Sequence, residues 1–267
     1  MVKKKKTPNW ALDPFERLLD HMQQAAQLLD LSTRGISVLR AMPQALQALA
    51  KAEPPSDAAT AQAGLDRAQK AAELARTEVD TGFPLLHAQA TISLWSDLEN
   101  ALRTFLATWL SHEPTASSIE PIQKLKVCLG EYESMDSDER CYYIVDRLEQ
   151  EIESRNRRGV DRFEALLAAF GFKSPLDKRV KRDLLELYHV RNVLVHRRGV
   201  ADRRLVQACP WLHLSAGEQI TVTPESYHKY LHAVGIYVLE LIVRVAGRFG
   251  FSRSELIQQP ASSTGLS

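Results

Sequence analysis

Residues 85–109 read LLHAQATISLWSDLENALRTFLATW and contain few charges. Apolar side chains recur in this stretch at steps of three and four residues, which places them along one side of an α-helix. They are Leu85, Ala88, Ile92, Trp95, Leu98, Leu102, Phe105, Leu106 and Trp109. An apolar stripe of this length predicts a helix at the centre of the hydrophobic core.

The same spacing continues on both sides of this segment and predicts a succession of helices. Apolar residues between 15 and 29 indicate a first helix, and those between 36 and 49 indicate a second helix that bends near Pro43. An alanine-rich helix is expected at about 58–79, after a proline-containing break. Toward the C-terminus, helices are expected at about 136–157, 162–170, 177–194 and 224–245.

Capping signals mark several of these helix ends. Asp136 and Glu139 have the spacing of a capping box at the start of a helix. Gly171 is typical of a helix C-cap, and Thr223 followed by Pro224 is typical of a helix start. These signals support the predicted boundaries independently of the apolar periodicity.

Together these patterns predict an all-α fold with one small β-hairpin insertion. The hairpin turn would be Ser215-Ala216-Gly217-Glu218, and its flanks would carry Leu212, Leu214, Ile220 and Val222. We expect residues 1–80 to form an N-terminal helical extension and residues 81–250 to form the main helical domain. Residues 251–267, rich in Pro, Ser, Thr and Gly, are expected to form a disordered tail.

The composition of the 267 residues, 45% hydrophobic and 25% charged, is that of an ordinary globular protein. We find no apolar run near the roughly 20 residues of a membrane span, and the solvated lysines Lys3–Lys6 precede no signal-peptide-like stretch. The cysteines Cys128, Cys141 and Cys209 lack the spacing of a disulfide framework or a zinc site. We therefore expect a cytoplasmic protein with buried free thiols, no membrane contact, no cofactor and no metal.

The net charge of +1 conceals a basic segment. Residues 177–204 contain nine Lys/Arg and four Asp/Glu, a local net charge of +5. At the end of this segment lie Arg197, Arg198, Arg203 and Arg204. These four are candidates to bind RNA phosphates. The alternative is a solvated helix end whose positive charge favours the helix dipole.

The basic segment includes LYHVRNVLVHRRGVAD, residues 187–202. Cleavage of RNA without a metal requires a proton donor and acceptor, for which histidine suits neutral pH, and a cation that grips phosphate oxygens, as arginine does. His196 and Arg191 provide these groups, and the amide of Asn192 can orient a neighbour. At about 100° per residue, Asn192 and His196 share a helix face, whereas Arg191 lies roughly 140° from His196. Two copies of the helix meeting at a two-fold axis would bring these groups into one cleft.

This Arg-Asn-x-x-x-His pattern at a helix end resembles the signature of the HEPN superfamily, in particular its bacterial ribonuclease-like domains. Gly199, Asp202 and the stretch Cys209-Pro210-Trp211-Leu212 add to the resemblance. The resemblance is strongest over residues 161–245, softer over residues 88–109 and absent from about the first 80 residues.

The resemblance implies a HEPN-type helical bundle that acts as a metal-independent endoribonuclease. Attack of the RNA 2′-hydroxyl would make the cut, and Arg191, Asn192 and His196 would be the catalytic residues. It also implies a homodimer with a composite active site. Such proteins are often toxins or anti-phage effectors that an antitoxin or regulator restrains.

Two other functions stay open. A non-catalytic HEPN module would bind RNA or a protein and serve for dimerisation. A toxin silenced by nucleotidyl transfer would carry a tyrosine two residues after the histidine, and Arg198 at that position argues against it.

Several further polar residues have a plain structural interpretation that we favour. Glu99 is expected to be a surface carboxylate, with pairing to Arg191 as the alternative. His189 and His213 are expected to be structural, and His228 and His232, although four residues apart, to be surface histidines rather than metal ligands.

Overall fold

The computed structural model describes residues 7–53, 56–154 and 159–251, and these are mostly helical. Within those ranges there is no strand, so the all-α prediction is confirmed. Lys3–Lys6, expected to be solvated, and all but the first residue of the tail predicted at 251–267 lie outside the described residues.

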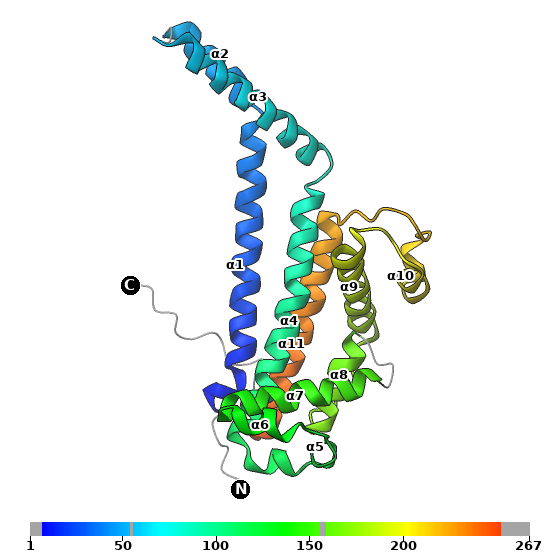
Figure 1. Cartoon of the computed structure of the whole chain (residues 1–267). Coiled ribbons are helices and arrows are strands. Elements are labelled where there is room, and N and C mark those ends of the chain that lie inside the picture. The colour runs from blue at the N-terminus through cyan, green and yellow to red at the C-terminus, as the bar shows by residue number, and fades with distance from the viewer. Residues whose placement is uncertain (1–6, 54–55, 155–158, 252–267) are drawn as a thin grey trace.

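Three N-terminal helices form a long arm (Figure 1). They are α1 (Asn9–Leu39), α2 (Met42–Ala52) and α3 (Ala58–Asp80). The helix predicted over residues 36–49 was wrong at its start, because α1 continues to Leu39 and the break falls just before Pro43. Pro43 lies in the first turn of α2, where a missing amide hydrogen costs nothing. The side chain of Asp57 caps α3 by accepting hydrogen bonds from the amides of Ala59 and Thr60.

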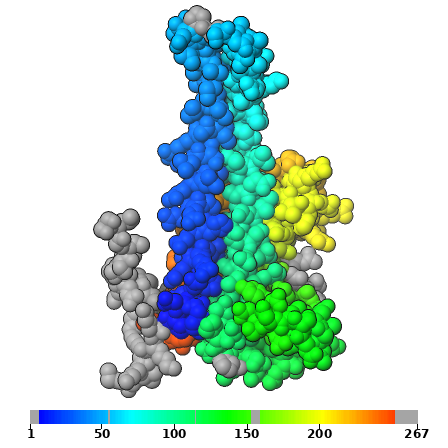
Figure 2. Space-filling model, turned by 60° about the vertical axis from the view of Figure 1, so that its left-hand side comes forward, coloured from blue at the N-terminus to red at the C-terminus, as the bar shows by residue number. Residues whose placement is uncertain are grey.

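The first half of α1 belongs to the main core, although it lies within the segment expected to be an extension. Its side chains Ala11, Phe15 and Leu18 are buried against the central helices. Farther along, α1 leaves α4 and is accompanied by α3, as the space-filling view shows (Figure 2). The division at residue 80 stays a prediction about domains.

The central element is α4 (Pro84–His112), as its apolar stripe predicts. Trp95, Leu98 and Phe105 on this helix are fully buried. Around it pack α1, α7 (Ser137–Ser154), α9 (Lys178–Arg197) and α11 (Pro224–Arg248). The remaining helical segments are shorter: η1 (Pro114–Ser118), α5 (Glu120–Gln123), α6 (Leu129–Ser134), α8 (Val160–Ala169), α10 (Arg203–Ala208) and η2 (Pro210–Leu212).

The predicted caps are confirmed. Asp136 accepts hydrogen bonds from the amides of Asp138 and Glu139, and Glu139 accepts one from the amide of Asp136. Gly171 follows α8 with φ +81°, the left-handed conformation of a C-cap. The side chain of Thr223 caps α11. Local spacing was enough here because a cap involves residues only two or three positions apart.

The predicted β-hairpin is not found among the described residues. Pro210 starts the short helix η2 and His213 has φ 53°, so residues 210–213 are turned rather than extended. The segment after the turn bonds instead to the segment that follows α9. The amide of Ala201 donates to the carbonyl of Glu218, and that of Ile220 donates to the carbonyl of Gly199.

By length and mean hydropathy, α11 could cross a membrane, and its inner face packs in the core against α4 and α9. The expectation of buried thiols was wrong for two of the cysteines. The three cysteines are free thiols, but Cys128 is exposed and Cys141 only half-buried, while Cys209 is buried.

Candidate active site

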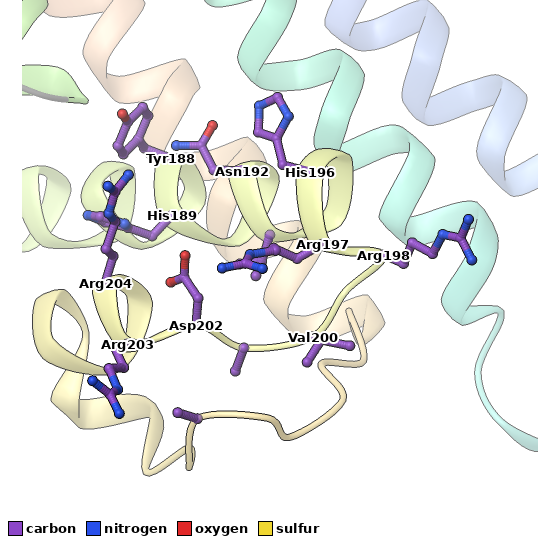
Figure 3. A pocket seen from close by; sticks show the side chains of 13 residues that line it. Tyr188, His189, Asn192, His196, Arg197, Arg198, Val200, Asp202, Arg203 and Arg204 are labelled. Carbon is purple, nitrogen blue, oxygen red and sulfur yellow. The ribbon is translucent and has the colours of Figure 1, made fainter.

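An open groove of about 1130 Å³ lies at the C-terminal end of α9, between this helix, α10 and the loop that contains Ala216. It is lined by Tyr188, His189, Asn192, Val193, His196, Arg197, Arg198, Val200, Ala201, Asp202, Arg203, Arg204 and Ala216. The side chains are drawn in Figure 3. The groove therefore collects most of the residues that the sequence motif singled out.

A sharp reversal of the chain after α9 creates the groove. Arg198 and Gly199 both have positive φ, 53° and 80°, which ends the helix and turns the backbone. The amide of Gly199 closes this end by donating to the carbonyl of Val193 at 3.0 Å. Asp202 then caps α10 by accepting from the amide of Leu205 at 2.9 Å. As a result, α10 runs beside α9 and forms the second wall.

Asn192 and His196 both line the groove, as expected for residues four apart on a helix. In Figure 3 they project from the same side of α9 as Tyr188. His196 is exposed and Asn192 is half-buried. A histidine reachable by solvent at the rim of a groove can take up and release protons without a large rearrangement.

His189, expected to be structural, also lines the groove. It is half-buried, and its ring makes an edge contact with that of Tyr188. The signal was present in the spacing, because His189 precedes His196 by seven residues and two helical turns bring a side chain back to nearly the same face. His213, by contrast, is exposed and is not a lining residue of the described groove.

Arg191 is not among the groove-lining residues of the described chain, in agreement with its angular offset from His196. Its guanidinium turns toward α4 instead. Nη1 donates to Oδ1 of Asn192 at 3.2 Å, and Nη2 lies 3.9 Å from Oε2 of Glu99. The favoured interpretation of Glu99 as a surface carboxylate was therefore wrong, and pairing with Arg191 is what the structure has.

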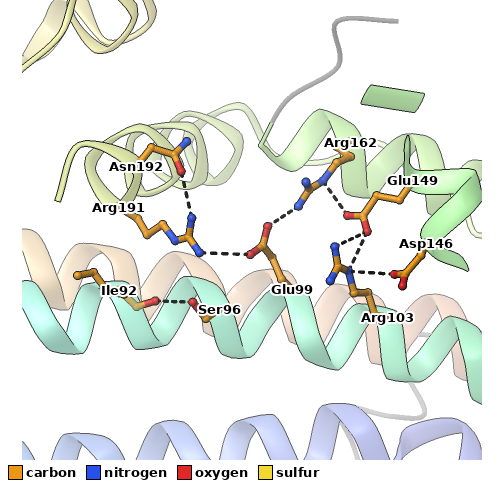
Figure 4. Close-up of polar contacts among 9 residues, drawn as sticks. All are labelled: Ile92, Ser96, Glu99, Arg103, Asp146, Glu149, Arg162, Arg191 and Asn192. Carbon is orange, nitrogen blue, oxygen red and sulfur yellow. Dashed lines mark hydrogen bonds and ion pairs between the residues drawn. The ribbon is translucent and has the colours of Figure 1, made fainter. Parts of the chain in front are cut away.

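Glu99 belongs to a series of alternating charges that crosses four helices (Figure 4). Its other oxygen, Oε1, accepts a short bond from Nη2 of Arg162 on α8. Nε of Arg162 lies 3.0 Å from Glu149 of α7, and Glu149 accepts from Arg103 of α4 at 2.8 Å. Arg162 and Glu149 are almost fully buried, so each needs the opposite charge beside it.

The four arginines proposed for RNA binding all line the groove and are all exposed. Figure 3 shows that they do not point in one direction: Arg197 and Arg204 lie between α9 and α10, Arg198 lies at the end of α9 and Arg203 on the far side of α10. The half-buried carboxylate of Asp202 lies among them. Among the described residues that line it, the groove thus has four arginines against the one carboxylate of Asp202.

A fully buried carboxylate, that of Glu186, connects α9 to η2 and α11. Glu186 is fully buried and accepts hydrogen bonds from Nε1 of Trp211 at 2.7 Å and from the hydroxyl of Tyr230 at 2.7 Å. Lys229 lies 2.5 Å from the same carboxylate. Burial, together with the nearby Glu186, raises the pKa of Tyr230 well above its usual range and that of the Cys209 thiol to about 12. These groups stay neutral and hold the segment after α10 in place.

The part of the chain that the structure describes contains no group of three or more His, Cys, Asp or Glu side chains arranged to hold a metal ion. His228 and His232 are exposed on α11, as predicted. Comparisons of this chain with protein-family models, with curated proteins and with solved structures found no match.

Proposed function

We propose that this chain is a metal-independent endoribonuclease of the HEPN type. One observation carries the proposal: a single open groove collects Asn192 and His196 of the motif together with the side chains of Arg197, Arg203 and Arg204. A polyanion in this groove would meet fixed positive charge and a solvent-accessible histidine at the same place.

The chemistry follows from the groups at the end of α9. His196 would act as general base on the 2′-hydroxyl or as general acid on the leaving 5′-oxygen. The products would be a 2′,3′-cyclic phosphate and a 5′-hydroxyl. Asn192 would orient the phosphate through its amide, and the flanking arginines would hold neighbouring phosphates. Arg191 would clamp the reacting phosphate, either after turning away from Glu99 or from a second copy of α9 across a two-fold axis.

A second function is a non-catalytic RNA- or protein-binding dimerisation module. It is favoured by the position of Arg191, which faces Glu99 and Asn192 rather than the groove. If the chain cleaves RNA, a restraining partner would be needed, as the resemblance to toxins and anti-phage effectors implies.

The two functions are separated by a cleavage assay on purified protein with single-stranded RNA and excess EDTA. We expect the wild-type chain to cleave, His196→Ala to lose at least about 100-fold in rate, the usual contribution of a general acid or base, and His232→Ala to cleave normally. His232 is an exposed histidine on α11 and serves as the matched control. Binding without cleavage would establish the module instead, and activity only with added magnesium or manganese would refute the proposed chemistry.

A further inference from the structure

The helical offset directs Arg191 away from His196, and contacts outside the motif determine what its guanidinium faces. The guanidinium contacts one carboxylate, that of Glu99 at 3.9 Å, and the amide oxygen of Asn192 at 3.2 Å. Among the described residues, its buried Nε atom has no hydrogen-bond partner. A guanidinium with an unsatisfied buried donor and a 3.9 Å ion pair is held loosely.

The looseness of this pair is explained by Arg162. Glu99 has one negative charge, and its Oε1 atom is bonded to Arg162 while Oε2 faces Arg191. Arg162 is in turn fixed by Glu149, whose side chain is only 4% exposed. The competition is unequal, because the Arg162 side chain is 9% exposed and the Arg191 side chain is 22% exposed. Opposite charges attract more strongly where water is excluded.

We propose that Glu99 is a latch that keeps Arg191 out of the groove, and that Arg162 sets how tightly the latch holds. The proposal rests on the proposed function, in which Arg191 must reach a phosphate. Glu99 and Arg162 would then be positioning residues, because neither lines the groove within the described chain. An RNA phosphate would compete with Glu99 for the same guanidinium, and the divided charge of Glu99 would make this exchange possible.

The latch can be tested without RNA, through the rate at which an arginine-specific dicarbonyl reagent, phenylglyoxal, modifies each arginine. We expect Glu99→Gln to raise the rate at Arg191 about two- to fivefold, the range that a partly exposed ion pair allows. The rates at Arg197, which is exposed, and at Arg244, which is buried beside Glu164, should stay unchanged. Peptide mass spectrometry resolves the three sites.

Two further variants sharpen this test. Arg162→Gln should lower the rate at Arg191 below that of the wild type, because both oxygens of Glu99 become free to turn toward it. Glu131→Gln is the matched control, since it removes a carboxylate that pairs with Arg147, away from the groove. If circular dichroism shows that Arg162→Gln does not fold, the modification rate at Arg191 in Glu99→Gln is the deciding measurement. An unchanged rate at Arg191 in Glu99→Gln, or a parallel rise at Arg244, would overturn the latch.

A binding measurement connects the latch to RNA. With a fully 2′-O-methylated single-stranded RNA that cannot be cleaved, Glu99→Gln should bind about two- to fivefold more tightly than the wild type. This gain should vanish when Arg191→Ala is added to Glu99→Gln. A gain that persists in the double variant would come from general charge and would contradict the latch. If the wild type does not bind RNA at all, the proposed function fails, and the reagent rates still decide whether the latch exists.

Discussion

Carboxylates connect α9 to its neighbours on two sides. The half-buried Glu99 and its partner Arg162 lie on the side of α4 and α8, whereas the buried Glu186 lies on the side of η2 and α11. Asp183, one turn before Glu186, is almost as deeply buried, and Arg182 lies 4.0 Å from it. Burial is the largest cause of the raised pKa of Asp183.

Asp183 makes the stability of the fold depend on pH. Burial raises the pKa of Asp183 above its ordinary value, and nearby Lys229 opposes this rise. A carboxyl whose pKa is raised by folding contributes stability below its unfolded pKa and loses it as pH rises through the folded pKa. Asp183→Asn should therefore raise the free energy of unfolding at pH 7, with no gain at pH 3. Urea unfolding at both pH values measures this, and an equal gain at both would exclude titration as its cause.

At the scale of elements, the groove depends on how α9 ends. The helix stops at a residue pair with positive φ, and the segment that follows is bonded to residues 217–220. Gly199 in this segment has φ +80°, and a Cβ atom there would lie 2.6 Å from Nε2 of Gln219. That amide nitrogen donates to the carbonyl of Arg198, so it cannot move without losing its bond. The backbone reversal after α9 therefore favours glycine at position 199.

Gly199→Ala should lower the free energy of unfolding by about 1–2 kcal/mol, the cost of a left-handed conformation at a residue with a Cβ atom. The groove should open at the same time, because α10 is positioned by this turn. Gly64→Ala is the matched control: Gly64 lies inside α3 with open space around it, and the change should stabilise by about 0.5–1 kcal/mol. Thermal unfolding compares the two variants. A neutral effect of Gly199→Ala would show that the turn is not constrained by its backbone conformation.

On the scale of the whole molecule, a compact helical body carries a long arm, and the groove lies on the body (Figure 1). Apart from the first half of α1, the arm contributes little to the core, since α2 has no buried residue and α3 buries only three alanines, Ala68, Ala72 and Ala75. The body presents two exposed valines beside the groove, Val195 with 44% and Val200 with 37% of its surface exposed. This end of α9 is the surface on which a second copy would complete the site.

If the active site is composite, the chain should be a dimer in solution. Light scattering at micromolar concentration should give twice the chain mass of 30.0 kDa. Val195→Glu should yield monomers without RNA cleavage, because a charge would be buried at the two-fold contact. Val38→Glu, at an exposed valine on the arm, should leave both the dimer and the cleavage intact. A wild-type monomer that cleaves RNA would rule out the composite site.

Local sequence was sufficient for the elements whose causes are local. The stripe in α4, the capping box of Asp136 and Glu139, and the shared face of Asn192 and His196 all arise from residues a few positions apart, where helical periodicity fixes the geometry. The angular offset of Arg191 from His196 also followed from that periodicity. The periodicity did not show that Arg191 contacts Glu99.

Only the tertiary structure decided which distant groups meet. Glu99 and Arg162 are 63 positions apart in the sequence, and no local pattern indicates that they bond. A hairpin was expected within residues 212–222. Residues 218 and 220 instead form backbone hydrogen bonds with residues 201 and 199, because the end of α9 lies beside them in space. Charges and backbone bonds act through distance in space, whereas helical periodicity acts along the chain. The residues of the motif could therefore be identified from the sequence, whereas the bond between Glu99 and Arg162 beside its arginine could not.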